Sequence, residues 1–179
     1  MLRVVDIQTV SIVIASASVV AGVIYYSLQI RHKNLQIQQQ TKMRQTDFLM
    51  RMYLEVCSES MRKARLTTLA LEIGDYDDFV KKYGPVFSAE PSQVWEDIDR
   101  TGWFYTGIGL LVYRKFVDIG LVDDFLGYGV VIAWEKLKPL VYGWRKQYNI
   151  PKSFGWFEYL YNEIKKYEQN LQQKGVSSG

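Results

Sequence analysis

The stretch VSIVIASASVVAGVIYYSL, Val10 to Leu28, decides the architecture of this chain. No charged residue interrupts it, and a helix needs about 20 mostly apolar residues to cross the roughly 30 Å core of a bilayer. Tyr25 and Tyr26 lie near its end, where amphipathic rings favour the membrane interface. We therefore predict a single N-terminal transmembrane helix, with residues 1–30 as the membrane anchor.

A cleaved signal peptide is the alternative interpretation of this stretch. The small residues Ala15-Ser16-Ala17 resemble a signal-peptide cleavage site. The apolar run continues well past them to Ile24, however, where a signal peptide would already have become polar. The pattern favours a retained anchor over a cleaved leader.

The charges on either side of the stretch predict its orientation. Before it stands only Arg3, which is offset by Asp6. The basic residues that follow it are Arg31, Lys33, Lys42 and Arg44. Basic residues concentrate on the cytoplasmic side of membrane helices, so we predict an outside N-terminus and a cytoplasmic C-terminal domain in the cell membrane. The single cysteine, Cys57, excludes an intrachain disulfide and agrees with a reducing compartment.

One face of the predicted membrane helix carries small residues. Ala15, Ser18 and Gly22 follow the spacing i, i+3, i+7, which allows two membrane helices to approach closely. This pattern predicts a homo-oligomer, although small residues are common enough in membrane helices for the spacing to arise by chance.

Residues 31–44 are predicted to form a helical stalk. No glycine or proline occurs from Val23 to Ile73, so nothing in the sequence obliges the membrane helix to end at the interface. Leu28, Leu35 and Leu49 fit a heptad that Lys42 interrupts. That is a weak coiled-coil signal, because three to four clean heptads are the usual requirement.

The rest of the chain is predicted to be an all-α cytoplasmic helical bundle, residues 45–173, followed by a disordered tail, residues 174–179. Capping residues and prolines divide it. The expected helices are Gln45–Ile73 broken near Ser58 and capped by Gly74, a short helix from Asp75 to Gly84, 92–115, 119–126 after Asp118, 129–148, and 153–173. Trp134, Leu137, Val141 and Trp144 are expected on one buried face.

Gly127-Tyr128-Gly129 resembles the core of a potassium-channel selectivity filter. A filter loop needs flanking membrane spans, and the apolar run from Phe125 to Trp134 is about half a span. The glycines are therefore expected to end one helix and start the next.

Four longer segments carry a resemblance to a known family. They are YYSLQIR at the end of the membrane helix, GLLVYRKFVDIGLVDDFLG, WEKLKPLVYGWRK and FEYLYNEIKK. The chain resembles an uncharacterised prokaryotic family with one N-terminal membrane helix and a helical cytoplasmic domain of unknown function. The resemblance covers nearly the whole chain, departs at Phe116, where a glycine is expected, and implies no catalytic residues.

The residues that usually carry chemistry are scarce. His32 is the only histidine, so a Cys/His zinc site or a histidine-based nucleophile is not expected. The acidic pairs are more simply helix starts and solvated faces than metal or acid–base sites; they are Asp77/Asp78, Asp97/Asp99 and Asp123/Asp124. No nucleotide-binding motif occurs, and a net charge of +3 does not indicate a nucleic-acid duplex as partner. We predict no enzymatic activity, no cofactor and no metal.

The most ligand-like cluster is cationic and aromatic. Lys138, Arg145 and Lys146 lie among tryptophans and form the candidate surface for an anionic small ligand or a cytoplasmic protein. Arg145 and Lys146 also suit the end of a helix, where cations complement the dipole. The sequence thus predicts a membrane-bound, self-associating interaction or sensor domain; the alternative is a ligand-gated oligomeric membrane effector or pore.

Overall fold

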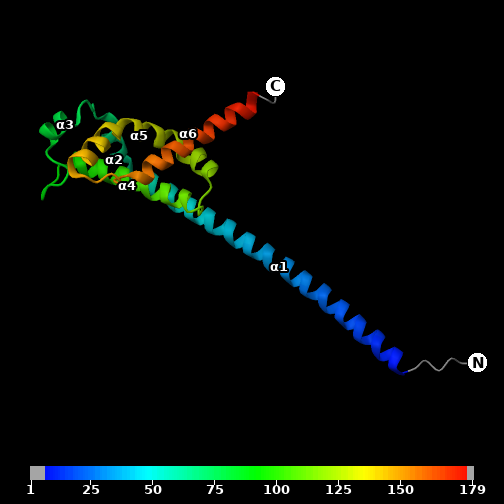
Figure 1. Ribbon diagram of the computed structural model, residues 1–179. Coiled ribbons are helices and arrows are strands. Elements are labelled where there is room, and N and C mark those ends of the chain that lie inside the picture. Colours follow the sequence, from blue (N-terminus) through cyan, green and yellow to red (C-terminus); the bar gives the residue numbers. More distant parts are fainter. Residues whose placement is uncertain (1–6, 177–179) are drawn as a thin grey trace, which may run out of the picture. The chain divides into compact units, whose positions relative to one another are not determined.

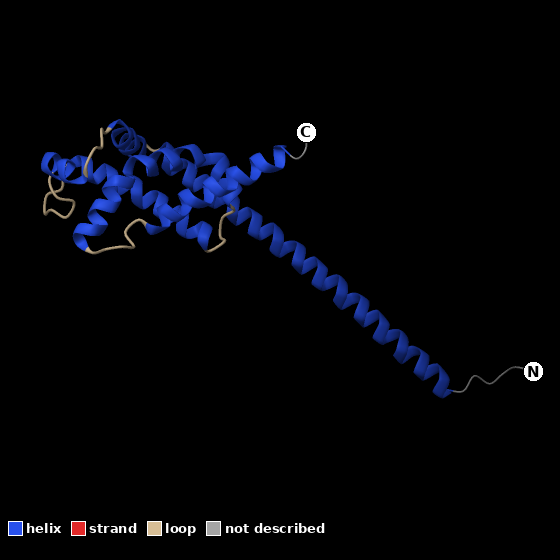
Figure 2. Ribbon diagram, turned by 45° about the horizontal axis from the view of Figure 1, so that its top comes forward, coloured by secondary structure: helices blue, strands red, loops and turns tan. Residues whose placement is uncertain are grey.

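The computed structural model describes residues 7–176, and the chain divides into two compact units, Met1–Phe48 and Leu49–Gly179. Within the described residues the secondary structure is entirely helical, which confirms the all-α prediction (Figure 1, Figure 2). The helices are α1 (Ile7–Cys57), α2 (Glu59–Ala70), α3 (Tyr76–Tyr83), α4 (Gln93–Tyr113), α5 (Ile119–Tyr148) and α6 (Gly155–Val176).

Helix α1 runs without a break from Ile7 to Cys57, as the absence of glycine and proline after Gly22 predicts. Its N-terminal part includes a window with a mean hydropathy of 1.9, long and apolar enough by length and composition to cross a membrane, and none of that window is buried. Ser16 and Ser18 donate to the carbonyl oxygens of Ile12 and Ile14 at 2.8 Å, so these hydroxyls are satisfied inside the helix.

The core of the second unit lies between α2, α4, α5 and α6. Helix α4 packs against α6 and α2, and α5 packs against α6 (Figure 1). The predicted stripe of α5, which includes Trp134, Leu137 and Trp144, is buried. Met52, near the end of α1, is also buried, so the last turns of α1 belong to this core.

Several helix starts agree with the sequence. Ser58 caps α2 and accepts a hydrogen bond from the Met61 amide, which explains the break predicted there. Asp118 caps α5 through the Gly120 amide at 2.9 Å. At the other end of α5, Asn149 adopts a left-handed conformation, which terminates the helix.

The prediction of a helix break at Gly127-Tyr128-Gly129 is wrong, because α5 continues through all three residues. Val122, Leu126 and Val130 are buried on the same face on both sides of Gly127. Burial of each such side chain contributes roughly 1.5–3 kcal/mol, whereas a helical glycine costs about 1 kcal/mol. Packing therefore outweighs the intrinsic preference of the two glycines.

Two helix ends also differ from the prediction. Gly74 is not the cap of α2: the helix ends at Ala70, and Leu71 leaves it in an extended conformation with its side chain buried. The predicted tail from residue 174 begins too early, because α6 continues to Val176. Residues 177–179 of that tail lie outside the described residues.

Candidate functional site

The three cations of the predicted ligand surface lie on the C-terminal half of α5, but they have different surroundings. Arg145 is half-buried, whereas Lys138 and Lys146 are exposed. The Lys138 ammonium lies over the Tyr142 ring, 5.7 Å from its centroid. Lys146 lines a separate hollow beside α3. The structure therefore brings Lys138 and Arg145 to one aromatic neighbourhood and places Lys146 elsewhere.

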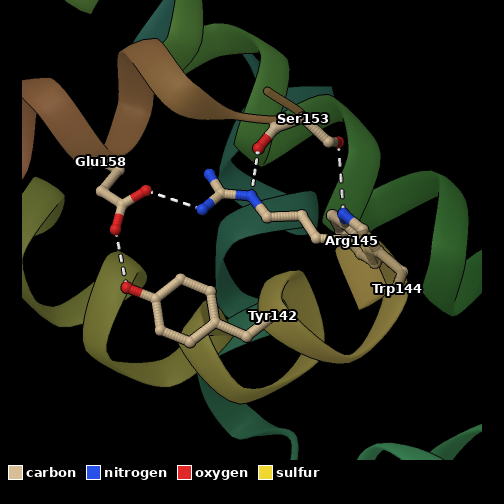
Figure 3. A network of polar contacts seen from close by, with 5 residues as sticks. All are labelled: Tyr142, Trp144, Arg145, Ser153 and Glu158. Carbon is tan, nitrogen blue, oxygen red and sulfur yellow. Dashed lines mark hydrogen bonds and ion pairs between the residues drawn. The ribbon is translucent and has the colours of Figure 1, made fainter. Parts of the chain in front are cut away.

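Arg145 is the centre of a polar network between α5 and α6 (Figure 3). Its Nη1 donates to the carboxylate of Glu158 at 2.7 Å, and its Nε donates to the backbone carbonyl of Ser153 at 2.8 Å. The Tyr142 hydroxyl donates to the other Glu158 oxygen at 2.6 Å. Trp144 Nε1 donates to the Ser153 hydroxyl at 3.2 Å. Two successive residues of α5, Trp144 and Arg145, therefore both bind Ser153 in the turn before α6.

The electrostatics of this network favour an ionised carboxylate. Burial pulls the pKa of Glu158 upward, but the hydrogen bonds from Tyr142 and Arg145 and the charges of Arg145 and Lys138 outweigh it, so that pKa is lowered. The bond to Glu158 and burial raise the pKa of Tyr142. The Arg145 guanidinium also lies over the Trp134 and Tyr142 rings, with centroid distances of 5.9 and 5.4 Å. Glu158 neutralises Arg145 through Nη1, and the remaining nitrogen, Nη2, is buried without a hydrogen-bond partner among the described residues.

The sequence did not indicate the partners of Arg145. Glu158 follows it by 13 residues, across the turn between α5 and α6. A usable signal was present nonetheless: a short connection makes neighbouring helices antiparallel, so a cation in the last turn of one meets an acid in the first turn of the next. Arg145 and Glu158 occupy those two positions.

A hollow of about 680 Å³ lies between α3 and α5. It is lined by Asp75, Tyr76, Asp77, Val80, Lys81, Gly143, Lys146 and Gln147. Burial, with a smaller contribution from Tyr148, raises the pKa of Tyr76 to about 12. Lys81 is paired with Asp78 at 2.9 Å. Because acidic and basic side chains share the rim, the hollow does not select for an anion.

The acidic pairs do not form a metal cluster: residues 7–176 contain no group of three His, Cys, Asp or Glu side chains arranged to hold an ion. Asp97 is buried in α4 and accepts a hydrogen bond from Gln93 at 3.2 Å, whereas Asp99 points outward. Partial burial of its carboxyl raises the pKa of Asp99. It also raises that of Asp123, beside the charges of Glu168 and Asp124.

The predicted membrane-packing residues lie on one face of α1. Ala15 and Ser18 are exposed, and nothing lies within 4 Å of the position that a Cβ of Gly22 would occupy. The four flanking cations are exposed, and among the described residues none of them enters an ion pair. These side chains are therefore available for contacts outside the chain.

Comparison with known proteins identifies the family. A family model described as a domain of unknown function, DUF4760, matches residues 12–164. The chain belongs to the DUF4760 family. The match extends from the apolar part of α1 into α6, so it includes the whole Arg145 network. It confirms the resemblance to an uncharacterised family. No curated protein and no solved structure matches the chain.

Proposed function

We propose that this DUF4760 chain is a single-pass membrane-anchored helical module that works by interaction, without catalysis, and that it self-associates. The N-terminal part of α1 would span the membrane, and the helical bundle would lie on the cytoplasmic side. The observation that carries the proposal is the apolar window of α1, of which no part is buried against the rest of the chain.

The physical chemistry of that window supports insertion. Leaving a valine or isoleucine side chain in water rather than burying it costs roughly 1.5–3 kcal/mol. Val13, Val20 and Ile24 are each more than half exposed, as are most of their apolar neighbours in the window. A bilayer would cover these side chains, and the helix satisfies its own backbone hydrogen bonds, as a membrane span requires.

The contacts of Arg145 support an interaction module over the ligand-gated pore. The pore hypothesis needs an anion site in the bundle, and Arg145 is the least exposed cation of the three that were candidates for it. Its guanidinium is bound to Glu158 and to the Ser153 carbonyl, so its contacts hold α6 against α5. The outward-facing surfaces of the helices are then the parts available to partners.

Membrane insertion is tested by extracting membranes with alkaline carbonate. The full-length chain should stay in the pellet, and Val19→Lys combined with Val20→Lys should move a large share to the supernatant, because a lysine at the bilayer centre costs roughly 2.5–3.5 kcal/mol. The matched control, Val19→Leu with Val20→Leu, should remain in the pellet. Recovery of the unaltered chain in the supernatant, or an intact mass lacking the N-terminal residues, would contradict the anchor.

The orientation is tested through Cys57, the only cysteine, which is exposed. A membrane-impermeant maleimide should label it in inverted vesicles and not in intact cells, and Cys57→Ser should abolish the signal. Labelling in intact cells alone would reverse the proposed topology.

A further inference from the structure

The outer face of α4 carries a stripe whose spacing is typical of helix pairing. Successive residues of the stripe are separated by four and three positions in turn, which is the spacing with which one helix packs along another. The α4 stripe consists of Glu96, Arg100, Trp103, Gly107, Leu110 and Arg114. All six are exposed, Trp103 at 57% and Leu110 at 36%. The opposite face of the helix is already used in the core. Within the stripe, the Trp103 ring contacts the Phe154 ring at a centroid distance of 5.4 Å, and the exposed remainder of the stripe is a second packing surface.

Gly107 is at the centre of the stripe and differs from the other glycines of α4. A Cβ at Gly109 would collide with the Trp156 carbonyl, and one at Gly102 would collide with the Phe154 ring. These two glycines therefore allow α6 and the residue before it to pack closely against α4. Nothing lies within 4 Å of a Cβ at Gly107. A glycine inside an exposed helix weakens it relative to alanine. A bulky side chain from another helix, seated on Gly107, would account for the missing side chain.

The ends of the stripe carry opposite charges. Glu96 is at the N-terminal end and Arg114 at the C-terminal end, and among the described residues neither side chain enters an ion pair. Arg114 caps the C-terminal end of α4, 18 positions after Glu96 (114 − 96), or about 27 Å at 1.5 Å per residue, so the two cannot pair within one chain. An identical helix running in the opposite direction places Glu96 of each copy opposite Arg114 of the other.

The same reversal places Trp103 opposite Gly107, while Arg100 falls opposite Leu110. Glu96 and Arg114 each lie nine positions from residue 105, and Trp103 and Gly107 each lie two positions from it. In an antiparallel pair centred there, Trp103 of each copy lies on Gly107 of the other, and Glu96 of each faces Arg114 of the other. A two-fold axis makes every such contact occur twice.

We propose that a second copy of this chain docks on the α4 stripe in this antiparallel arrangement. A groove of about 590 Å³, lined by Trp103 together with Glu55 and Met61, offers room for side chains of the second copy. The inference deepens the proposed function, since it names the surface through which the anchored module pairs. It does not require the small-residue face of α1 to take part.

Charge exchange in full-length protein tests the pairing. In a Cys57→Ser background, Gly107→Cys should give a crosslinked dimer with a short bismaleimide. Adding Glu96→Arg or Arg114→Glu should reduce the dimer roughly tenfold, because each places two like-charge contacts in the interface. Glu96→Arg with Arg114→Glu together should restore it. Since the two positions cannot touch within one chain, only contact between copies explains rescue.

Two controls make the experiment decisive. Tyr128→Cys, on α5 and outside the stripe, should crosslink weakly and be unaffected by the charge changes. Tryptophan fluorescence should confirm that the exposed charge variants remain folded. Equal crosslinking at positions 107 and 128, or a double exchange that fails to restore the dimer, would overturn the pairing. Carbonate extraction of the same variants reports on the anchor separately: a failed rescue in protein that stays in the pellet rejects this interface and leaves the membrane proposal standing.

Discussion

At the scale of single residues, Gly107 and Gly109 have opposite surroundings although only one residue separates them. Gly109 is buried where α6 crosses α4, and a Cβ there would overlap the Trp156 carbonyl, whereas Gly107 faces open space. The backbone of α6 cannot yield as a flexible side chain can. The structure therefore shows close packing at Gly109 and not at Gly107.

Alanine substitutions should separate these two glycines. Gly109→Ala should lower the free energy of unfolding by about 1–3 kcal/mol through overpacking. Gly107→Ala should raise it by up to about 1 kcal/mol, because alanine is the better helix former. Urea unfolding of dilute full-length protein in detergent, followed by tryptophan fluorescence, measures both, since all five tryptophans lie in the unit Leu49–Gly179. If both substitutions lowered the free energy of unfolding by a similar amount, the assignment of Gly109 as packed and Gly107 as open would be wrong.

Glu158 should make the stability of the bundle depend on pH. Its pKa in the folded chain lies below the ordinary value of 4.5, so its ionised form stabilises the fold above that pH. The contribution is lost as the pH falls below 4.5 and through the folded pKa. Glu158→Gln should cost about 1–3 kcal/mol at neutral pH, because it removes the charged partner of Arg145. The same substitution should also make the free energy of unfolding fall less steeply below pH 4.5.

Glu163 offers the matched control for that measurement. It lies on the same helix, and its one ion pair among residues 7–176 is with Lys166, at 4.0 Å. Surface pairs of this kind contribute at most about 1 kcal/mol. Glu163→Gln should therefore leave the free energy of unfolding and its pH dependence close to those of the unaltered chain. If Glu158→Gln and the unaltered protein had the same pH profile of stability, the titration of Glu158 would not contribute to that profile.

At the scale of elements, the continuity of α5 is the main departure from the sequence prediction. Glycine and tyrosine at positions 127–129 are typical of a helix end, and nothing local contradicts that interpretation. The buried residues before and after them decide the matter, because one continuous helix buries both sets, and α5 packs against α6 and α2. Propensity is a weak preference that tertiary contacts override.

A proline at position 128 distinguishes a continuous helix from a broken one. Tyr128 is 82% exposed, so replacing it removes little packing. Tyr128→Pro should cost about 3 kcal/mol or more, since proline within a helix loses a hydrogen bond and clashes with the preceding turn. Tyr128→Ala should change the free energy of unfolding by less than about 0.5 kcal/mol. If the proline were as well tolerated as the alanine in urea unfolding, the glycines would form a turn.

At the scale of the whole molecule, the two units differ in what stabilises them. The second unit has its own core, in which Trp134, Leu137 and Ile164 are almost fully buried. Its polar network joins α5 to α6 within the same unit. None of the apolar window of α1 is buried. The bundle should therefore fold without the anchor.

A chain of residues 45–179 tests this independence. It keeps the last turns of α1, which supply the buried Met52. It should stay in solution without detergent and unfold with the same urea midpoint as the bundle of the full-length protein. A chain beginning after Met52 provides the contrast, and should lose about 2–5 kcal/mol, as removal of a buried methionine does. Aggregation of both chains would show that the bundle depends on the anchor.

The sequence by itself determined what local chemistry decides: an all-helical chain, one uninterrupted apolar helix at its start, and helix starts at residues such as Ser58 and Asp118. Apolar periodicity, caps and breakers act within a few residues, so a single sequence contains them. The tertiary structure decided that α5 continues through Gly129 and that Arg145 is bound to Glu158. It also decided that Gly107 faces open space whereas Gly109 packs against the Trp156 carbonyl. Each of these depends on which segment lies against which, and burial between distant segments outweighs the local preference.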